Sequence, residues 1–499
     1  MWMLPLLVLA ALQDPQPEDS AVKIFSTVRT PDFDRPWTKN GPMESTGSGV
    51  ILEGEFLITN AHVINYAQRI EIQPSGSADR FEAEVAFVSY EDDLALLRPE
   101  DPDFFSTFPA VSLSASLPAS GSKVQVVGFP SGGEEISTTA GIVSRFLFRR
   151  AGGFRGLAIQ TDAPINEGNS GGPVFQDGKV VGIAFQKDKQ AKTDNVGYVI
   201  PAETVTRFIA DVADGDFDGV RLLPVHWSKC ENPAMRAFLR LPKDQKGVIL
   251  YPSSSWTPEN FTVQDLDVLL AIDGHDVDNF GRIDVEGAGM LDWEYQIPWS
   301  SGDGTISLTV WRDGGVAEIQ AQTPLDVPLR VVKLEGSYPS YYVYGPVTFI
   351  EMSEELVNSM NGNLLHAQLM RNWTGIKEAS QPAENEGDHV VVATFFLHSH
   401  RIAKGYDSPL LWPVLRSVDG APIKSLRHLA SLLENHDPGT TFFEFANGGV
   451  HDLNNPTRKG KQDFAFDHAT VLKTREEILE GAGIRRHYSK DLADLVKDE

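Results

Sequence analysis

Three short segments contain a histidine, an aspartate and a serine in a form that could perform nucleophilic catalysis. They are Leu57–Val63 (LITNAHV), Asp92–Leu97 (DDLALL) and Gly168–Pro173 (GNSGGP), in that chain order. A serine hydroxyl is a weak nucleophile at neutral pH and needs a base such as imidazole within hydrogen-bond reach. The imidazole needs a carboxylate on its other ring nitrogen, which fixes its tautomer and stabilises its protonated form. Together the segments predict a site for attack on a carbonyl carbon.

The serine segment also offers what the oxyanion of such a reaction requires. Gly168 has no Cβ, so the turn before Ser170 can adopt positive φ and point backbone N–H groups inward. We expect the oxyanion hole at Gly168, Asn169 and Ser170, with the amides of Gly168 and Ser170 as the two donors.

The carboxylate of the predicted site can come from either of two adjacent aspartates. His62 is the expected base and Ser170 the expected nucleophile. Asp93 is favoured over Asp92 because it adjoins the strand-like run Leu94–Leu97 and should point toward the imidazole.

These residues lie in a part of the chain that reads as short strands. From Ala21 to Val199, short alternating apolar runs are broken by Gly, Pro and Asn, which is typical of an all-β barrel or sandwich. An amphipathic helix follows, with Gly215 where its C-terminal cap belongs. Its apolar residues recur at helical spacing: Val205, Phe208, Ile209 and Val212.

Beyond this helix, two segments echo each other. Val268–Val277 and Val414–Ile423 each combine an apolar strand, an Asp-Gly turn and another apolar position. Two related β-rich modules are the simplest account. We therefore predict a first domain at 21–213, modules at 217–323 and 325–471, and a solvated helical tail at 474–499.

Composition excludes several classes of function. The chain has 499 residues, a net charge of −26 and one cysteine, Cys230. Such negative charge argues against binding to nucleic acid or anionic membranes, and no apolar run reaches the roughly 20 residues that span a bilayer. Residues 1–13 read as a signal peptide and 14–20 as a flexible lead-in, so we expect export to the periplasm or the extracellular space.

The catalytic motifs, together with VVGFPSGG, TTAGIVSR and NVGYVIP, resemble the chymotrypsin-fold serine endopeptidases of the Deg/HtrA family. PDFDRPW near Asp32–Trp37 and WSKCENPAMR at Trp227–Arg236 are similar to the plant-type branch. The resemblance implies a mainly β fold, with a chymotrypsin-like double β-barrel followed by two PDZ-like α+β domains. It also implies ATP-independent cleavage of unfolded or damaged proteins and homo-oligomers built from trimers.

By the same resemblance, the base of the substrate side-chain pocket lies six residues before the nucleophile, at Pro164, where no acid stands. The pocket should therefore be apolar and should select small or medium aliphatic side chains with little discrimination. Its expected lining residues are Pro164, Ile165, Ile183, Ala184 and Phe185.

Two further sites are expected from the resemblance. Phe217-Asp218-Gly219-Val220 matches a PDZ loop that holds a peptide C-terminus with backbone N–H groups, although an ordinary turn is the alternative. In the second module the matching loop, Val343–Pro346, contains proline, which favours a structural role. The segment Arg145–Gly156 occupies the place of a loop that senses the PDZ domain, or is merely a solvated hairpin loop. Its candidate regulatory residues are Arg145, Arg149 and Arg150.

No metal ion or cofactor is expected. His398 and His400 share one face of a strand-like run, but no Cys or acidic ligand set accompanies them. The alternative function is a chaperone, holdase or scaffold that uses the same fold for binding. A scaffold without catalysis need not keep His62, Asp93, Ser170 and Gly168 together.

Overall fold

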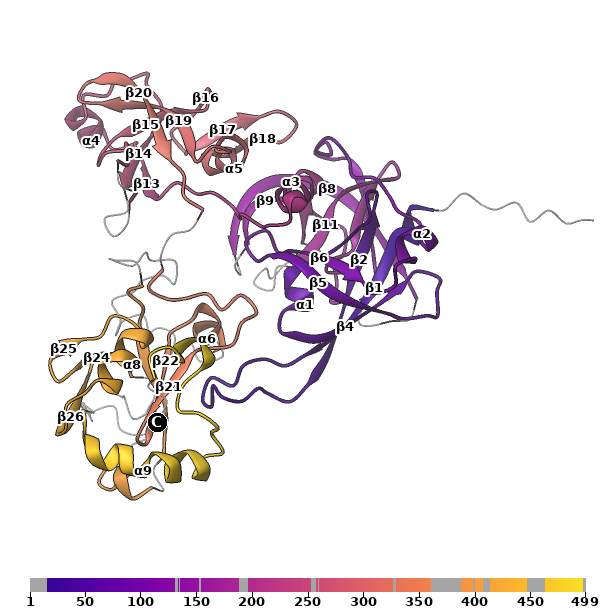
Figure 1. Ribbon diagram of the computed structural model, residues 1–499. Coiled ribbons are helices and arrows are strands. Elements are labelled where there is room, and N and C mark those ends of the chain that lie inside the picture. Colours follow the sequence, from indigo (N-terminus) through magenta and orange to yellow (C-terminus); the bar gives the residue numbers. More distant parts are fainter. Residues whose placement is uncertain are drawn as a thin grey trace, which may run out of the picture.

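The computed structural model describes residues 16–130, 133, 135–151, 154–187, 196–252, 257–258, 260–325, 329–359, 387–397, 400–406, 413–446 and 463–496. These residues form two closed β-barrels followed by two smaller β-rich modules, which confirms the predicted fold class. In Figure 1 the barrels lie to the right, with the first module at upper left and the second at lower left. The predicted signal peptide, residues 1–13, lies outside the described residues.

The first barrel is a closed sheet in the order β1-β2-β3-β6-β5-β4. Its strands are β1 (Ala21–Val28), β2 (Met43–Leu52), β3 (Phe56–Thr59), β4 (Ala67–Pro74), β5 (Phe81–Ser89) and β6 (Leu94–Pro99). Helix α1 (Ala61–Ile64) follows β3 directly, and α2 (Phe104–Thr107) follows β6. Antiparallel pairing sets Thr59 opposite Ala95, so the turn after β3 lies beside the turn before β6.

The second barrel closes in the order β10-β11-β12-β9-β8-β7. Its strands are β7 (Lys123–Gly128), β8 (Ser137–Ala151), β9 (Phe154–Thr161), β10 (Pro173–Gln176), β11 (Lys179–Lys187) and β12 (Gly197–Pro201). The predicted amphipathic helix is α3 (Ala202–Asp211), continued by η3 (Val212–Asp214). Gly215 ends it with φ of 99°, as the sequence indicates.

The first module is built on the sheet β13-β14-β15-β19-β20, with β16 paired to β15. Its elements are β13 (Val225–Lys229), α4 (Pro233–Phe238), β14 (Val248–Pro252), β15 (Val268–Ile272), β16 (His275–Asp276), β17 (Arg282–Val285), β18 (Gly289–Asp292), η4 (Trp293–Gln296), α5 (Ile297–Ser300), β19 (Thr305–Arg312) and β20 (Gly315–Gln322). One apolar core joins this module to the second barrel, because Val143 and Leu157 belong to the same cluster as Leu291 and Trp293.

The second module combines the sheets β21-β22-β23 and β25-β24-β26-β27. Its elements are β21 (Tyr341–Tyr344), β22 (Val347–Glu351), α6 (Glu354–Ser359), β23 (Val391–Phe396), η6 (Arg401–Ala403), β24 (Leu415–Val418), β25 (Ala421–Pro422), α8 (Leu426–Glu434), β26 (Thr440–Phe445), β27 (Phe464–Asp467), α9 (His468–Gly481) and η7 (Lys490–Leu492). The echoed segments form matching hairpins. Both residues of each Asp-Gly turn have positive φ: Asp273 (46°), Gly274 (79°), Asp419 (50°) and Gly420 (80°).

Two expectations about the chain ends are corrected. The lead-in is not flexible throughout, because Pro17–Ser20 forms a turn of 3-10 helix (η1) in which Asp19 accepts the Gln16 N–H at 2.8 Å. The segment from residue 474 is not a separate solvated tail. Helix α9 already begins at His468, and the Val343 N–H donates to the His487 carbonyl at 2.6 Å. Apolar burial explains this, since Leu492 is 2% exposed in the core of the second module.

Candidate active site

His62 and Asp93 meet where the first barrel brings two turns together. His62 lies on α1, directly after β3, and Asp93 directly precedes β6. The His62 Nδ1 atom lies 2.7 Å from Asp93 Oδ2, and the His62 backbone N–H donates to Asp93 Oδ1 at 2.9 Å. Asp93 has φ of 52°, and its carbonyl accepts bonds from Asn60 Nδ2 and the Ala61 N–H. Both carboxylate oxygens are thus directed at one residue.

Asp92 points elsewhere. Its side chain is 2% exposed and pairs with Arg207 of α3 at 2.6 Å, while the Ser89 hydroxyl donates to its other oxygen at 3.0 Å. Burial raises the pKa of the Asp92 carboxyl, and the Arg207 charge opposes that rise. This aspartate joins the first barrel to the helix that follows the second barrel.

Ser170 lies on a tight turn that leads into β10. Its hydroxyl donates to the Phe185 carbonyl at 3.3 Å, and its own carbonyl accepts the Ser48 N–H at 2.9 Å. Gly171 has φ of 85°, and a Cβ there would lie 2.1 Å from the Ser48 carbonyl oxygen. Only glycine fits at that position, because the first barrel approaches the turn so closely.

The amides of this turn alternate in direction. Gly168 has φ of 98°, and the Asn169 N–H turns back to the Asn166 carbonyl at 3.0 Å. Among the described residues no acceptor pairs with the N–H of Gly168 or Ser170. Asn169 itself is 0% exposed. Within the described residues the amides of Gly168 and Ser170 thus have no backbone acceptor while that of Asn169 has one, which is compatible with the predicted pair of oxyanion donors.

Ser48 contributes to the site, although the sequence motifs did not single it out. Its hydroxyl donates to the Gly168 carbonyl at 2.7 Å and accepts the Phe129 N–H at 2.9 Å. It is fully buried and lies on β2 of the first barrel. A run of small residues before an apolar strand was the only signal in the sequence, and many turns share that signal.

The expected pocket residues do not share one surface. Along β11, side chains alternate, so Ile183 and Phe185 join one core cluster and Ala184 joins another with Ile165. The Ile165 side chain lies against Gly197, where a Cβ would come within 2.7 Å of it. The carbonyl of Pro164 accepts the Thr139 hydroxyl at 2.9 Å. Strand alternation therefore separates the side chains of Ile165 and Ala184 from those of Ile183 and Phe185, and the pocket-lining role of these residues stays a prediction.

The expected PDZ carboxylate loop is also corrected. Phe217 packs edge-to-face on Phe208 of α3, with ring centroids 5.7 Å apart. The Gly219 N–H donates to Asp211 Oδ2 at 3.2 Å, and Val220 is 8% exposed. Phe217, Asp218, Gly219 and Val220 thus form part of the connection from α3 to the first module. The amide needed for a peptide carboxylate already has a carboxylate partner.

The expected regulatory loop is a strand hairpin, since Arg145 and Arg149 both lie within β8. The Arg145 side chain donates to Gln160 at 2.8 Å, and the Arg149 guanidinium lies 3.8 Å from the centroid of the Tyr198 ring. Arg150 also lies on β8, and its side chain is outside the described part of the structure. Beside the shared apolar core, Arg155 of β9 makes a polar contact with the first module, where it pairs with the buried Glu294 at 2.5 Å.

Comparisons with protein families agree with this architecture. A family model of the trypsin-like peptidase domain matches residues 47–183. A model of the PDZ domain matches residues 331–491, the module in which the sequence carries the weaker loop motif. Two closed barrels matched by the trypsin-like peptidase model, with a PDZ domain after them, define a chymotrypsin-fold serine peptidase.

Curated relatives identify the family. The chain is 30% identical over 445 residues to Protease Do-like 2, chloroplastic, of Arabidopsis thaliana, covering 88% of this chain and 72% of that protein. It is 30% identical over 419 residues to Protease Do-like 4, mitochondrial, of the same plant, covering 83% and 77%. The chain belongs to the Do-like (Deg/HtrA) family of serine proteases, as its motifs predict.

A solved structure, the HtrA-type protease AlgW with decapeptide, aligns with 62% of this chain and 97% of its own at 22% identity and a TM-score of 0.47. Among the described residues, no helix is both long and apolar enough to cross a membrane.

Proposed function

We propose that this protein is an ATP-independent serine endopeptidase that degrades unfolded or damaged proteins through Ser170, His62 and Asp93. The His62 imidazole takes the proton of the Ser170 hydroxyl as the oxygen attacks the substrate carbonyl carbon. It then gives that proton to the leaving amine, and water hydrolyses the acyl-enzyme by the same steps. Asp93 holds the imidazole and stabilises its protonated form.

The observation that carries this proposal is the double contact of Asp93 with His62, through the ring at 2.7 Å and the backbone at 2.9 Å. Because Nδ1 faces Asp93, Nε2 is the ring nitrogen that would exchange the proton with Ser170. The amides of Gly168 and Ser170, which have no backbone acceptor among the described residues, would supply the two donors that the oxyanion of the tetrahedral intermediate requires.

The substrate class rests on the family and on the pocket. The apolar side chain of Ile165 lies against Gly197. No charged group is expected at the base of the pocket, so discrimination between substrate side chains should be weak. We propose that unfolding of the substrate, rather than its sequence, is the main filter. The PDZ modules would bind substrate peptides or regulate access to the active site.

Assembly and location are part of the same proposal. We propose homo-oligomers built from trimers, as in the family the motifs resemble. Export to the periplasm or the extracellular space remains the prediction for this chain. The two relatives are named for the chloroplast and the mitochondrion, so organelle import is the competing route.

Replacing Ser170 by alanine is expected to abolish turnover, because the oxyanion hole and binding alone leave only about 10³–10⁴-fold acceleration over water. Degradation of casein and of an unfolded model protein would be followed for the wild type and Ser170→Ala on gels. Ser120→Ala, an exposed change in the second barrel, is the control for handling and folding.

Casein degradation by Ser170→Ala at the wild-type rate would contradict the proposal. If neither protein cleaves but both suppress aggregation of the unfolded substrate, the holdase alternative is correct instead.

A further inference from the structure

The turn that carries Asp93 is anchored at four consecutive residues, and two of these anchors belong to the segment that leads into the second module. Asp93 holds His62, and Asp92 pairs with Arg207. The Glu91 carboxylate lies 3.6 Å from Lys333 Nζ. The Tyr90 hydroxyl lies against Gly336, where a Cβ would come within 2.3 Å of it.

The same segment reaches the turn that carries His62. Helix α1 ends at Ile64, and Tyr66 follows with φ of 60°. Its ring lies 5.7 Å from that of Tyr338, centroid to centroid. The Tyr338 hydroxyl donates to the Arg29 carbonyl at 2.7 Å, and the Arg29 N–H donates to the Tyr66 carbonyl at 3.1 Å. One stretch, Lys333–Tyr338, thus contacts both the turn that carries His62 and the turn that carries Asp93.

This stretch is fixed to the second module. Glu355 of α6 accepts the N–H groups of Leu334, at 3.0 and 3.1 Å, and of Glu335, at 3.2 Å. The Val332 N–H donates to the Met352 carbonyl at 3.0 Å, and that of Ser337 to the Leu334 carbonyl at 2.8 Å. The stretch should therefore move with α6 and β22 rather than as an independent linker.

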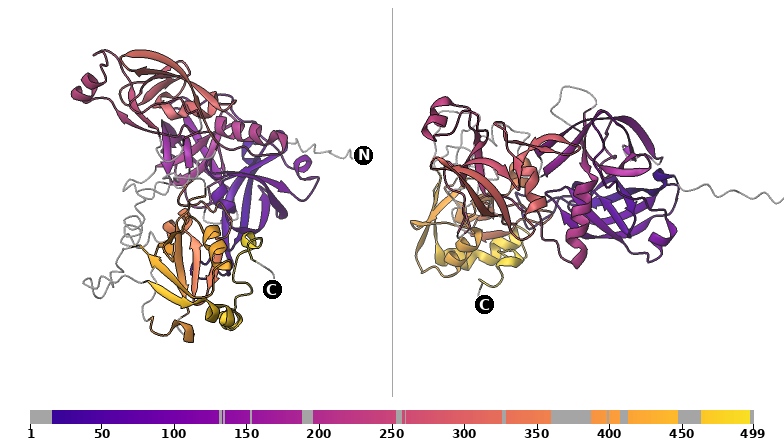
Figure 2. Two further views of the ribbon diagram at one scale, coloured as in Figure 1. Left: turned by 60° about the vertical axis from the view of Figure 1, so that its left-hand side comes forward. Right: turned by 90° about the horizontal axis from the view of Figure 1, so that it is seen from above.

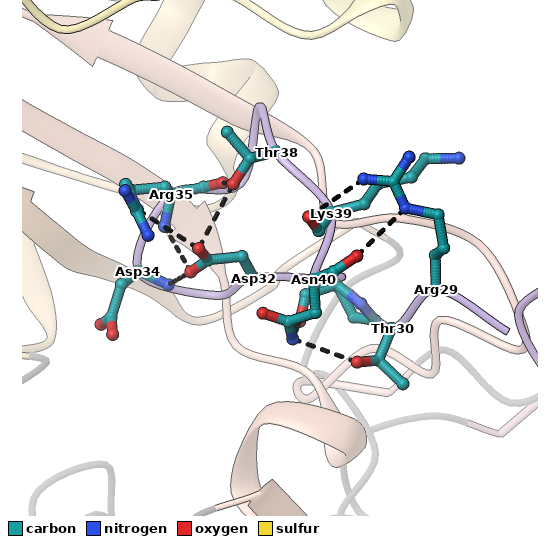
Figure 3. A network of polar contacts seen from close by, with 9 residues as sticks. Arg29, Thr30, Asp32, Asp34, Arg35, Thr38, Lys39 and Asn40 are labelled. Carbon is teal, nitrogen blue, oxygen red and sulfur yellow. Dashed lines mark hydrogen bonds and ion pairs between the residues drawn. The ribbon is translucent and has the colours of Figure 1, made fainter. Parts of the chain in front are cut away.

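A second contact links the second module to the first barrel. The loop between β1 and β2 is stabilised by internal hydrogen bonds (Figure 3). Asp32 accepts hydrogen bonds from Arg35 and Thr38, and the Arg29 side chain donates to the Asn40 carbonyl. Its Trp37 ring lies 6.0 Å from that of Tyr341, and Phe33 packs on the core around Ile350 and Leu356. In Figures 1 and 2 the second module lies beside the first barrel.

The pKa shifts of Glu91 and Tyr90 are those expected where the second module packs directly on the turn before Asp93. Burial raises the pKa of the Glu91 carboxyl, and the charges of Lys333 and Arg155 oppose that rise. Burial, together with Glu335 and Glu355, raises the pKa of the Tyr90 hydroxyl to about 12. Groups of the second module therefore lie close enough to act on the residues directly before Asp93.

We propose that Lys333–Tyr338 is a positioning clamp for the His62–Asp93 pair, with Lys333 and Gly336 as its positioning residues. The second module, through this clamp, sets how well the pair is ordered. The inference rests on the proposed function, because it assigns a role in the reaction of Ser170, His62 and Asp93. It predicts that perturbing the clamp lowers kcat without weakening substrate binding.

The sharpest variant is Gly336→Ala, because the added Cβ would collide with Tyr90 Oη at 2.3 Å and approach Asn65 Oδ1 at 3.3 Å. Its matched control is Gly420→Ala in the same module. Gly420 has nearly the same φ, 80° against 78°, and nothing within 4 Å of the added Cβ. Both changes carry the same backbone strain, and only Gly336→Ala disturbs the clamp.

The assay measures hydrolysis of a short reporter peptide by the full-length protein, with kcat and KM separated across pH. We expect Gly336→Ala to lower kcat by about 10- to 100-fold, since small misplacements of catalytic groups cost that much. KM should change less than about twofold, and Gly420→Ala should match the wild type. A loosened Asp93 stabilises the imidazolium less, so the acid limb of the kcat/KM profile should move to lower pH.

A second variant covers the case in which Gly336→Ala fails to fold. Lys333→Met removes one charge of the pair with Glu91 and should lower kcat in the same direction, whereas Lys473→Met on α9 should not. Glu91→Gln added to Lys333→Met should cost no more than either change alone, because both remove one interaction.

Three outcomes decide the matter. A wild-type kcat and an unmoved acid limb in folded Gly336→Ala or Lys333→Met overturn the clamp and leave the proposed function standing. An equal loss in Gly420→Ala or Lys473→Met also overturns it, because general destabilisation then explains the effect. A wild-type protein whose cleavage does not depend on Ser170 overturns the proposed function, and the clamp with it.

Discussion

Two neighbouring carboxylates do different work because their surroundings differ. Asp93 faces a half-exposed imidazole, and in the proposed mechanism its charge stabilises the proton that His62 takes up during the reaction. Asp92 is buried, and its carboxylate forms an ion pair with Arg207. Sequence neighbours can diverge in this way because the left-handed backbone at Asp93, with φ of 52°, turns the two side chains apart.

At this scale we predict that Asp93→Asn and Asp92→Asn fail differently. Asp93→Asn should lower kcat by about 10⁴-fold through the wrong imidazole tautomer, with little change in melting temperature. Asp92→Asn should leave the kcat of the folded protein nearly unchanged but destabilise it by about 3 kcal/mol, because Arg207 loses its buried partner. Peptide kinetics and thermal melting of both variants test this. The opposite pattern would assign the catalytic carboxylate to Asp92.

The hairpin of β8 and β9 lies between the active site and the first module. At one face, Phe154 packs on Phe185, with ring centroids 4.7 Å apart, and the Phe185 carbonyl accepts the Ser170 hydroxyl. At another, Arg155 pairs with Glu294, which also accepts the Trp227 indole N–H at 3.2 Å. The hairpin thus contacts both Phe185, next to Ser170, and Glu294 of the first module. Such a continuous set of contacts is what coupling between the active site and the first module requires.

At the scale of elements we predict that Glu294→Gln reduces the response of the protease to peptide bound at the modules. Coupling free energies are typically about 1–3 kcal/mol, or roughly 5- to 150-fold in activity, and the variant should lose most of that response. Reporter cleavage would be measured with and without a short peptide that ends in an apolar residue and a free carboxylate. Arg145→Ala, which removes a side-chain hydrogen bond to Gln160 within the hairpin, is the control. Equal activation of wild type and Glu294→Gln would exclude the hairpin as the relay.

The whole molecule carries a net charge of −26. A strongly negative protein attracts cationic chains and repels anionic ones, and the effect is screened by salt. With the weak side-chain selection proposed above, this long-range field would supply a substantial part of the substrate selectivity.

We therefore predict that an unfolded basic protein is degraded faster than the same protein after succinylation of its lysines. The ratio of kcat/KM values should reach about 10-fold or more at low salt, as for other steered encounters. It should shrink toward unity at high salt, where the screening length falls to about 3 Å. Initial rates for both forms across a salt series provide the measurement, and a ratio that does not change with salt contradicts the prediction.

Local sequence patterns were sufficient to predict many of the secondary-structure elements of this protein and its class of chemistry. Strand alternation predicted an all-β barrel or sandwich, spacing predicted α3, and the two Asp-Gly segments predicted related β-rich modules, because each pattern depends on residues close along the chain. The types of His62, Asp93 and Ser170 pointed to the chemistry for the same reason, since serine catalysis needs those functional groups.

Tertiary structure decided what depends on contacts between distant segments. It placed Phe217–Val220 on α3, separated Ala184 from Ile183 and Phe185, and joined the tail to the second module. It also brought Ser48 to the Gly168 turn and Lys333 to Glu91, across 120 and 242 residues of chain. No local pattern encodes such contacts, because they arise only when barrels and modules pack together and close long loops.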